Sequence, residues 1–560
     1  MNAARPPGAA RRMTPLDAML TILREEGVDR VFGNPGTTEL PFLDALTDAE
    51  DIEYVLGVQE ASVVAMADGY ARATGRPAFV SLHVAAGLAN GLVGLLNARR
   101  SRTPLVVTAG QQDRRHLVQD PMLSGDLVGL ARPAVKHVFD VQHGYDLPVM
   151  LRRAFALAVQ PPAGPVFLSV PMDLLDEDTP VEVPDRSVLA PQGPATEVAA
   201  AARLLAGAER PVIVAGDGVG RDGAVAELVA LAEALGAAVY HQPMHDALDF
   251  PFTHPLHQGA LAPVNAEIRA TLSPYDVVLV VGAHAFTPHH YSPGSPVPET
   301  ATVIQLDPDP GEPGRAFPVS LGLVGAIRPT LAALAGELTG RVTAAGERTD
   351  ALRRAAELRR ALVESEVLAG YGPAPLDPLS AAHAVAAALP DDAVVLEEAI
   401  TTGLKLREVL RLEAPGSLLH TVGGGLGWGV GGAVGHRLGD PRRPVVAVLG
   451  DGCTMFGLQG LWSAARYGVP VTFVVMNNGE YRTLKHTLDD RDSRATRAGH
   501  YPGLDLGPPR LDFTRAAAFF GVESVRVTDP RHLSEVVAKA VQGDSPLLIE
   551  VPITAHADEG

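Results

Sequence analysis

The sequence is poor in the groups that support covalent cross-links, basic surfaces and membrane spans. It has one cysteine, Cys453, among 560 residues. This excludes an internal disulfide, a zinc ribbon and an iron–sulfur site, and predicts a reducing compartment, the cytoplasm. Basic side chains number 46 against 65 acidic ones, a formal charge of −19, so neither nucleic acid nor an anionic membrane is the expected partner. Charges interrupt the apolar stretch after Met13, and we expect no secretory signal or membrane span.

What the sequence does contain is a regular alternation of short apolar runs and helical segments. Continuous Val/Leu/Ile runs that are followed by Gly or Asp and then a helix are typical of buried parallel strands in α/β units. The clearest runs cover 77–82, 104–110, 165–171, 210–218, 276–283, 302–307, 392–398, 444–452 and 470–478. Their number and regularity predict an α/β protein with three doubly wound parallel-sheet domains.

Two changes in composition divide the chain into these domains. A segment rich in proline and acids covers 176–197, and a charged helical stretch ends near 367, shortly before a new apolar pattern begins. We predict domains over 13–178, 196–345 and 375–555.

The segment 445–481 carries the strongest chemical signal. One strand ends at Gly450-Asp451-Gly452, a helix follows, and the next strand ends at Asn478. Parallel strands bring both ends to the same edge of a sheet, where ligands bind. The carboxylate of Asp451 and the amide oxygen of Asn478 suit Mg²⁺ that is shared with the phosphates of a ligand. The alternative is a pair of ordinary βα turns in which Asp451 caps a helix.

This segment resembles the signature of thiamine-diphosphate-dependent enzymes, GDG followed about two dozen residues later by NN. A second match lies in FGNPGTTELPFLDAL (32–46) and in 54–91, which contains VQEAS, ADGYA and LHVAAG. Together with VTAGQQ, GGLG and MNNGEY, these motifs are similar to those of benzoylformate decarboxylase and its relatives. The resemblance implies an N-terminal pyrimidine-binding domain, a central Rossmann-like domain and a C-terminal domain that binds diphosphate and Mg²⁺. It also implies a homodimer or homotetramer with the active site at the subunit interface.

The resemblance further implies which residues hold the cofactor. A carboxylate at N1′ of the aminopyrimidine favours the tautomer that removes the thiazolium C2 proton, and Glu60 matches it. Leu426 matches the apolar side chain that bends the cofactor, and the Gly424 carbonyl the acceptor of its 4′-amino group. The full set of implied contacts is Glu60, Asn90, Thr401, Thr402, Gly424, Leu426, Gly450, Gly452 and Asn478 for the cofactor, and Asp451, Asn478 and Glu480 for the metal. Structural alternatives stay open: an exposed acid at a helix start, a flexible glycine turn and N-capping threonines.

Two histidines match the proton-relay positions of the family. His83 follows a strand, and His289 lies in the central domain; a neutral imidazole suits proton transfer near pH 7. A structural role for either is the alternative, and a shift of one residue would exchange His289 with His290. Thr37 stands where the relatives carry a serine that faces the substrate carboxylate. His420 and Thr487 replace aromatic residues that enclose the phenyl ring of benzoylformate, so the substrate is open to question.

The expected reaction is the non-oxidative decarboxylation of a small 2-oxo acid to an aldehyde and CO₂. The alternative is an acetolactate synthase-like carboligase that joins an enamine to a second carbonyl compound, and a third hypothesis is a silent binding protein. The motif GVGRDG (218–223) is a formal GxGxxG, but the following strand ends in Tyr240 and His241 and lacks the acid that binds a ribose. We therefore expect no required NAD, while FAD stays open.

Overall fold

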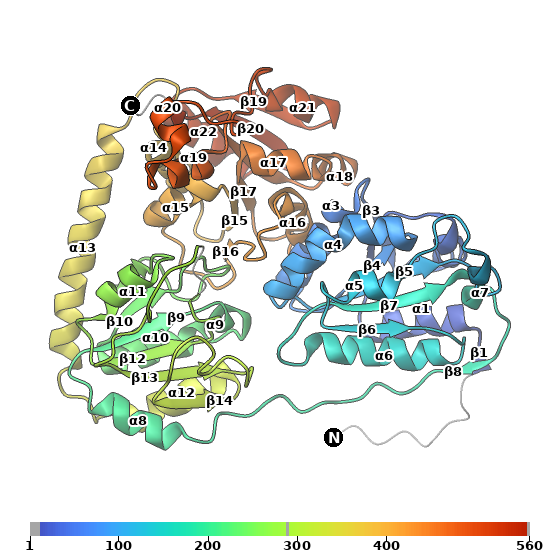
Figure 1. Ribbon diagram of the computed structural model, residues 1–560, viewed down its shortest axis with the longest axis horizontal. Helices are drawn as coiled ribbons and strands as arrows, with labels where there is room; N and C mark the ends of the chain where they lie inside the picture. Colours follow the sequence, from blue (N-terminus) through green and yellow to red (C-terminus); the bar gives the residue numbers. More distant parts are fainter. Residues whose placement is uncertain (1–11, 287–289, 557–560) are drawn as a thin grey trace.

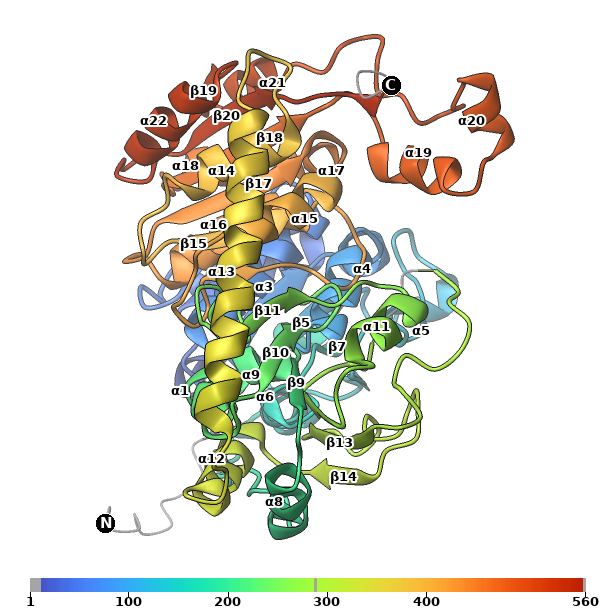
Figure 2. The same cartoon turned by 90° about the vertical axis from the view of Figure 1, so that its left-hand side faces the viewer.

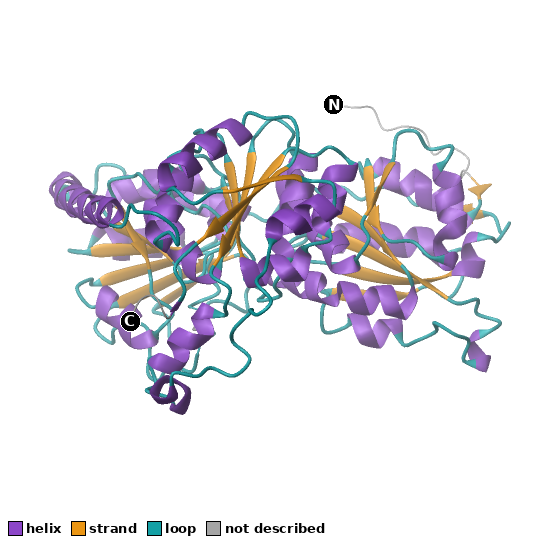
Figure 3. Ribbon diagram, turned by 90° about the horizontal axis from the view of Figure 1, so that it is seen from above, coloured by secondary structure: helices purple, strands orange, loops and turns teal. Residues whose placement is uncertain are grey.

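The computed structural model describes residues 12–286 and 290–556. The described residues form three six-stranded parallel sheets with helices packed on both faces (Figures 1 and 3), which confirms the predicted fold class. The sheets lie inside the predicted ranges 13–178, 196–345 and 375–555, whose exact limits stay predictions. In the described part of the chain, no helix combines the length and the apolar character needed to cross a membrane.

The first sheet lies in the N-terminal part of the chain. Its strands are ordered β3 (Glu53–Leu56), β2 (Arg30–Gly33), β4 (Ala78–Leu82), β5 (Leu105–Gln111), β7 (Val166–Pro171) and β6 (His137–Asp140). The helices around it are α1 (Pro15–Glu25), α2 (Leu40–Leu46), α3 (Glu60–Thr74), α4 (Val84–Arg100), α5 (Leu127–Ala131), α6 (Asp146–Val159) and α7 (Met172–Leu175), with 3₁₀ turns η1 (Thr37–Glu39) and η2 (Leu117–Gln119). A short antiparallel pair, β1 (Arg12–Met13) and β8 (Val181–Glu182), closes this unit.

The second sheet lies in the middle of the chain. Its strands are ordered β11 (His257–Ala260), β10 (Ala238–His241), β9 (Pro211–Ala215), β12 (Val277–Val281), β13 (Thr302–Asp307) and β14 (Leu321–Val324). Its helices are α8 (Val198–Ala206), α9 (Gly218–Arg221), α10 (Val225–Leu235), α11 (Asn265–Leu272) and α12 (Ile327–Leu338). The long helix α13 (Ala345–Ala369) then runs along the outside of the molecule to the third unit (Figure 2).

The third sheet carries the signature segment. Its strands are ordered β16 (Leu418–Leu419), β15 (Val394–Glu398), β17 (Val445–Gly450), β18 (Val471–Asn477), β20 (Leu547–Pro552) and β19 (Glu523–Arg526). Its helices are α14 (Pro378–Ala386), α15 (Ile400–Val409), α16 (Trp428–Gly439), α17 (Asp451–Gly457), α18 (Gly460–Arg466), α19 (Arg482–Asp489), α20 (Arg494–Ala498), α21 (Phe513–Phe519) and α22 (Pro530–Ala540).

All nine apolar runs form strands, because each lies within a sheet that is covered by helices on both faces. Strands β4, β9, β12 and β15 are buried at every position, as expected where helices cover both faces. Edge strands such as β3 and β14 are short and partly exposed, so they leave a weaker apolar pattern.

Helices α3 and α16 join the first and third units through glycines. A Cβ added at Gly431 would lie 2.8 Å from the carbonyl oxygen of Ser62, and one at Gly435 would overlap the carbonyl oxygen of Met66. The two backbones are therefore in direct contact, and the helices pack side by side between the two sheets (Figure 1).

This contact leads to a stability prediction. Gly435→Ala should destabilise the protein by at least about 1–3 kcal/mol, because the added methyl group has no space against the main chain of Met66. Gly336→Ala is the matched control: this helical glycine has open space around it, and alanine there should raise stability by about 0.5–1 kcal/mol. Urea unfolding measures both changes. Equal effects of the two substitutions would contradict the proposed contact.

Candidate active site

Glu60 is held at the start of α3 by two asparagine side chains. The residue is 7% exposed. Its Oε1 accepts a hydrogen bond from Nδ2 of Asn34 at 3.0 Å, and its Oε2 accepts one from Nδ2 of Asn90 at 3.0 Å. The sequence had singled out Glu60 and Asn90 but not Asn34, which lies inside the FGNPG motif. The carboxylate is thus buried, oriented and without a basic partner among the described residues.

His83 follows β4 and is paired with a buried acid that the sequence analysis missed. Its Nδ1 lies 2.9 Å from Oε2 of Glu39 and 3.1 Å from the hydroxyl of Thr38. Glu39 is 4% exposed, and it also accepts the N–H of Gly36 at 2.9 Å and of Gly110 at 3.1 Å. With the Nδ1 proton directed at Glu39, Nε2 is left for proton exchange. The ELPF motif could have indicated Glu39, because it contains a charged side chain that becomes buried.

The segment around His83 places it close to Glu60. A Cβ at Gly87 would lie 3.3 Å from Oε1 of Glu60 and 3.5 Å from Cβ of His83, so this glycine lets both groups occupy one edge of the sheet. Val84 has a φ of 42°, a strained conformation for a β-branched residue, of the kind that concentrates at functional sites. Thr37 is exposed at the start of η1.

Asp451 is a buried carboxylate in the third unit. It is 4% exposed, and its two oxygens accept the main-chain N–H groups of Gly452 and Gly479, each at 2.7 Å. Burial raises the pKa of Asp451 to about 6, and the described residues offer it no basic side chain within 4 Å. Asn478 lies beside it and is half-buried. An uncompensated carboxylate next to an amide is a donor set that fits a hard divalent cation whose other ligands are phosphate, main chain or water.

Glu480 differs from Asp451 because its carboxylate already has partners. Lys485 forms a close ion pair with Oε2, and the N–H of His556 donates to Oε1 at 2.6 Å. No group of three or more His, Cys, Asp or Glu side chains in the described ranges is arranged to hold a metal. Coordination of a metal by Glu480 stays a prediction. Because its carboxylate is paired with Lys485, the main-chain carbonyl is the group of this residue that remains for a metal.

The glycine-rich loop before α16 is fixed at two points. Asn97 in α4 pairs with the main chain of Gly425: its Nδ2 donates to the carbonyl at 2.7 Å and its Oδ1 accepts the N–H at 3.0 Å. Glu398 at the end of β15 accepts the N–H groups of Gly427, Trp428 and Gly429 at 3.0, 3.1 and 2.9 Å. The partly exposed Leu426 lies between these anchors, and Gly424, with φ +77° and no heavy atom within 4 Å of a Cβ built there, directly precedes the first of them.

The start of α15 lies next to the GDG triplet. Thr401 and Thr402 are in its first turn, and a Cβ at Gly450 would be 3.7 Å from Cα of Ala399. A Cβ at Gly452 would be 2.8 Å from the ring of Tyr481, so glycine is needed for this close approach. Free N–H groups at a helix start are a suitable site for a diphosphate.

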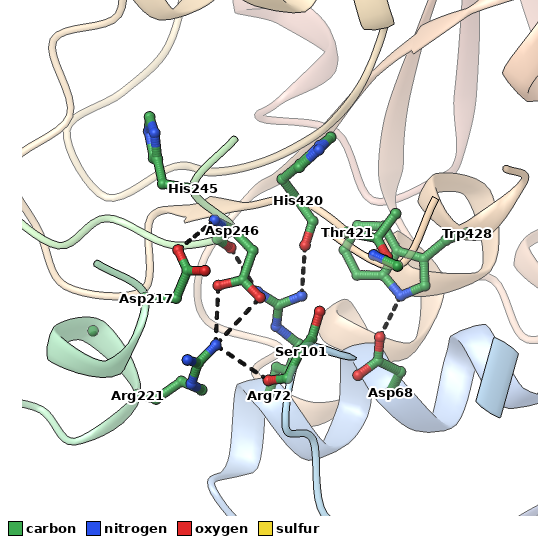
Figure 4. A network of polar contacts seen from close by, with 12 residues as sticks. Asp68, Arg72, Ser101, Asp217, Arg221, His245, Asp246, His420, Thr421 and Trp428 are labelled. Atoms are coloured by element: carbon green, nitrogen blue, oxygen red, sulfur yellow. Dashed lines mark hydrogen bonds and ion pairs between the residues drawn. The ribbon is translucent and has the colours of Figure 1, made fainter. Parts of the chain in front are cut away.

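The remaining predicted residues are His420, Thr487 and His289. His420 is 4% exposed at the junction of the three units (Figure 4); its Nδ1 contacts the carbonyl of Glu397 at 2.8 Å. Burial lowers the pKa of His420. Thr487 is half-buried in α19 and donates its hydroxyl to the Thr483 carbonyl at 2.9 Å. His289 lies outside the described residues. Substrate contacts by His420 and Thr487 stay predictions.

The GxGxxG motif of the middle unit is used for packing. A Cβ at Gly218 would lie 2.8 Å from Cα of Gly282, and one at Gly220 would lie 3.0 Å from Cβ of Ala247. Nearby, burial raises the pKa of Asp217 to about 7 and also raises that of Asp249. Two glycines of this motif therefore serve close packing beside buried acids, and the expectation about NAD stays a prediction.

Comparison with known proteins identifies the family. The models of the thiamine pyrophosphate enzyme N-terminal binding domain, central domain and C-terminal binding domain match residues 13–149, 198–334 and 402–551. Benzoylformate decarboxylase of Pseudomonas aeruginosa is 37% identical, with 96% of this chain and 98% of that protein covered. The chain belongs to the thiamine pyrophosphate enzymes.

Other members of this enzyme family support the assignment. Acetolactate synthase isozyme 3 large subunit of Escherichia coli is 28% identical, with 96% of this chain and 94% of that protein covered. The solved structure of a Rhodococcus jostii thiamine diphosphate-dependent 4-hydroxybenzoylformate decarboxylase matches with a TM-score of 0.85 and 34% identity, covering 97% of this chain and 99% of that one. Benzoylformate decarboxylase from Polynucleobacter necessarius matches with a TM-score of 0.85 and 30% identity, with 97% and 99% covered. Thiamine diphosphate is therefore the cofactor of this chain.

The loop anchor Glu398 leads to a pH prediction. Burial raises the pKa of Glu398 to about 8 from 4.5, although its three N–H donors oppose the shift. The native protein thus keeps a proton that the unfolded chain releases, so this group lowers stability as pH rises from about 4.5 to 8. The melting temperature of the cofactor-free wild type should fall relative to that of Glu398→Gln over this window. The exposed Glu337→Gln is the control, and a pH-independent difference for Glu398→Gln would contradict the shift.

Proposed function

We propose that this thiamine pyrophosphate enzyme is a Mg²⁺-dependent 2-oxo acid decarboxylase that releases CO₂ and an aldehyde. The observation that carries the proposal is the pair of half-sites described above: a buried, oriented Glu60 beside His83, and an uncompensated Asp451 beside Asn478. The similarity to benzoylformate decarboxylases supports the reaction class. When bound, thiamine diphosphate supplies a nucleophilic carbon and an electron sink for the loss of CO₂.

The residues of the first unit, together with His289, His420 and Thr487 of the other two units, would hold and move protons and contact the substrate. Glu60 would hold the proton at N1′ of the aminopyrimidine, and its two asparagine contacts keep it oriented for that role. His83, with Nδ1 directed at Glu39, would exchange protons with substrate atoms through Nε2, and His289 would be the second relay. The Thr37 hydroxyl would donate to the substrate carboxylate. His420 and Thr487 would border the substrate pocket.

The residues of the third unit bind the charged end of the cofactor. Asp451, Asn478 and Glu480 would hold Mg²⁺, which would in turn neutralise the diphosphate. The first turn of α15, with Thr401 and Thr402, and the glycines Gly450 and Gly452 would contact the phosphate oxygens. Gly424 and Leu426, on the anchored loop, would contact the aminopyrimidine and keep the cofactor bent.

We further propose that two chains form each active site, in a homodimer or homotetramer in the cytoplasm. Large apolar side chains are exposed next to both half-sites. They are Leu40, Val58 and Leu96 in the first unit, and Ile400, Leu404, Met455 and Phe456 in the third. Apolar side chains gathered around a site are typical of a protein interface, and a second copy would bring the Glu60 side of one chain against the Asp451 side of the other.

A panel of 2-oxo acids tests the decarboxylase. Purified protein with Mg²⁺ and thiamine diphosphate should release CO₂ from at least one aromatic or aliphatic 2-oxo acid, and treatment with a chelator should abolish release until Mg²⁺ is restored. Glu60→Gln should lower the rate at least about 10²-fold, since it removes the proton-holding carboxylate, while the melting temperature changes little. Glu337→Gln should keep full activity. No CO₂ from any 2-oxo acid would refute the proposal.

Carboligation is the second candidate, favoured by the similarity to acetolactate synthases over nearly the whole chain. In that reaction the decarboxylated fragment is joined to a second carbonyl compound. Product analysis with an added acceptor aldehyde separates the two functions. We expect mainly free aldehyde, because His83 with its Glu39 partner supplies a proton to the fragment; a 2-hydroxyketone as the main product would establish the carboligase.

A further inference from the structure

A cavity lies beside the proposed cofactor edge, and Asn478 is the one lining residue to which a role has been given. Its volume is about 750 Å³, within the usual range for small-molecule sites, about 300–1,000 Å³. It opens at the carboxyl ends of β18, β20 and β19, marked by Asn477, Pro552 and Arg526. These neighbouring strands lie in the upper part of the molecule in Figure 2. The carboxyl ends of parallel strands are where α/β sheets bind ligands.

The walls of the cavity are apolar with two arginines. Leu506, Leu511 and Ile553 line it together with several prolines. Arg526 donates one N–H to Oε1 of the fully buried Glu550 at 2.9 Å, which leaves further N–H groups of its five. Arg510 is exposed, and the described residues offer it no carboxylate within 4 Å. Arg526 and Glu550 compensate each other, so Arg510 leaves the cavity with a net positive charge.

These features select a ligand of one chemical class. An anion is favoured by the uncompensated Arg510, and a planar carboxylate matches the fork of a guanidinium. The leucine, isoleucine and proline walls favour an apolar body over a sugar or a nucleotide. We propose that this cavity is a second binding site, adjoining the cofactor site at Asn478, for a small monocarboxylate with an apolar body.

The cavity shares a wall with the loop that holds the predicted metal ligands. The lining residues Asn478 and Gly479 belong to that loop. Gly479 accepts the N–H of Leu506 at 2.7 Å through its carbonyl and donates its own N–H to Asp451 at 2.7 Å. A ligand packed against Leu506 and Gly479 therefore restrains the main chain that orients Asp451, and it should strengthen Mg²⁺ binding, with the reciprocal effect of Mg²⁺ on the ligand. This coupling rests on the proposed function; the binding site itself does not.

Calorimetric titration of the full-length protein with 3-phenylpropionate tests the site. The wild type, the Glu60→Gln variant and the Arg510→Lys variant should all bind the probe. Arg510→Gln should weaken binding about tenfold, the usual cost of one charge-assisted hydrogen bond. Arg515→Gln is the matched control, because Arg515 is exposed on the same unit, is paired with Asp512 and lies outside the cavity. The uncharged 3-phenylpropionamide should bind at least about tenfold more weakly than the acid.

Two results would overturn the proposal. Equal affinity of the wild type and Arg510→Gln would show that the probe binds elsewhere, and equal affinity for the acid and the amide would remove the basis for an anion site. Titration of Mg²⁺ with thiamine diphosphate, with and without the probe, tests the coupling: tighter Mg²⁺ binding in the wild type but not in Arg510→Gln supports it, and no change refutes it. Loss of decarboxylase activity in every assay, with the probe still bound, would refute the proposed function alone.

Discussion

The direct backbone contact between α3 and α16 is the constraint on which the candidate site depends. Glu60 opens α3, and the glycine-rich loop with Gly424 and Leu426 leads into α16. Because Gly431 and Gly435 have no side chain, the two helices approach until main-chain atoms touch. Within one chain, the spacing between the Glu60 half-site and the half-site of the third unit is therefore set by backbone, which deforms less than side chains do, so a second copy would meet half-sites of fixed spacing.

Beside this helix pair, a buried ionic network joins the three units (Figure 4). Arg72, in the last turn of α3, donates to the carbonyl of His420 at 2.8 Å and to that of Asp246 at 2.6 Å, and its guanidinium lies 5.4 Å from the Trp428 ring centroid. One side chain of the first unit thus binds both ends of the loop that follows β16, and also the middle unit. Arg221 adds a contact to the carbonyl of Ser101 at 3.3 Å. A buried network of this kind specifies one arrangement of the three units, since unpaired charges there would be costly.

The sequence was sufficient to predict the sheets and the residues at the ends of strands, because apolar runs and GDG-type turns are local signals. Asp451 and Asn478 were found in this way, whereas Glu60 was found through the resemblance of its motif to the family. Four site residues were missed because each contacts the main chain or a partner that is distant in sequence, so that no motif spacing indicates them. They are Glu39, Asn34, Asn97 and Glu398. His420 shows the same limit: alignment places it near the substrate, whereas its burial against Glu397 depends on how three units meet. The ion pair between Glu480 and Lys485 also could not be predicted from a sequence motif.

The buried acids of the third unit differ in whether neighbouring side chains compensate their charge. Glu397 has Arg407 at 2.8 Å and His420 at 3.3 Å, and these two side chains hold its pKa below the usual value despite burial. Glu398 and Asp451 have only main-chain N–H donors, and burial raises both pKa values. Side chains therefore compensate Glu397 at the unit junction, while Glu398 and Asp451, at the carboxyl ends of β15 and β17, are left with main-chain donors alone. A divalent cation held by Asp451 would supply positive charge there and would favour the ionised form of this carboxyl, whereas Glu398 keeps its proton in the cofactor-free protein.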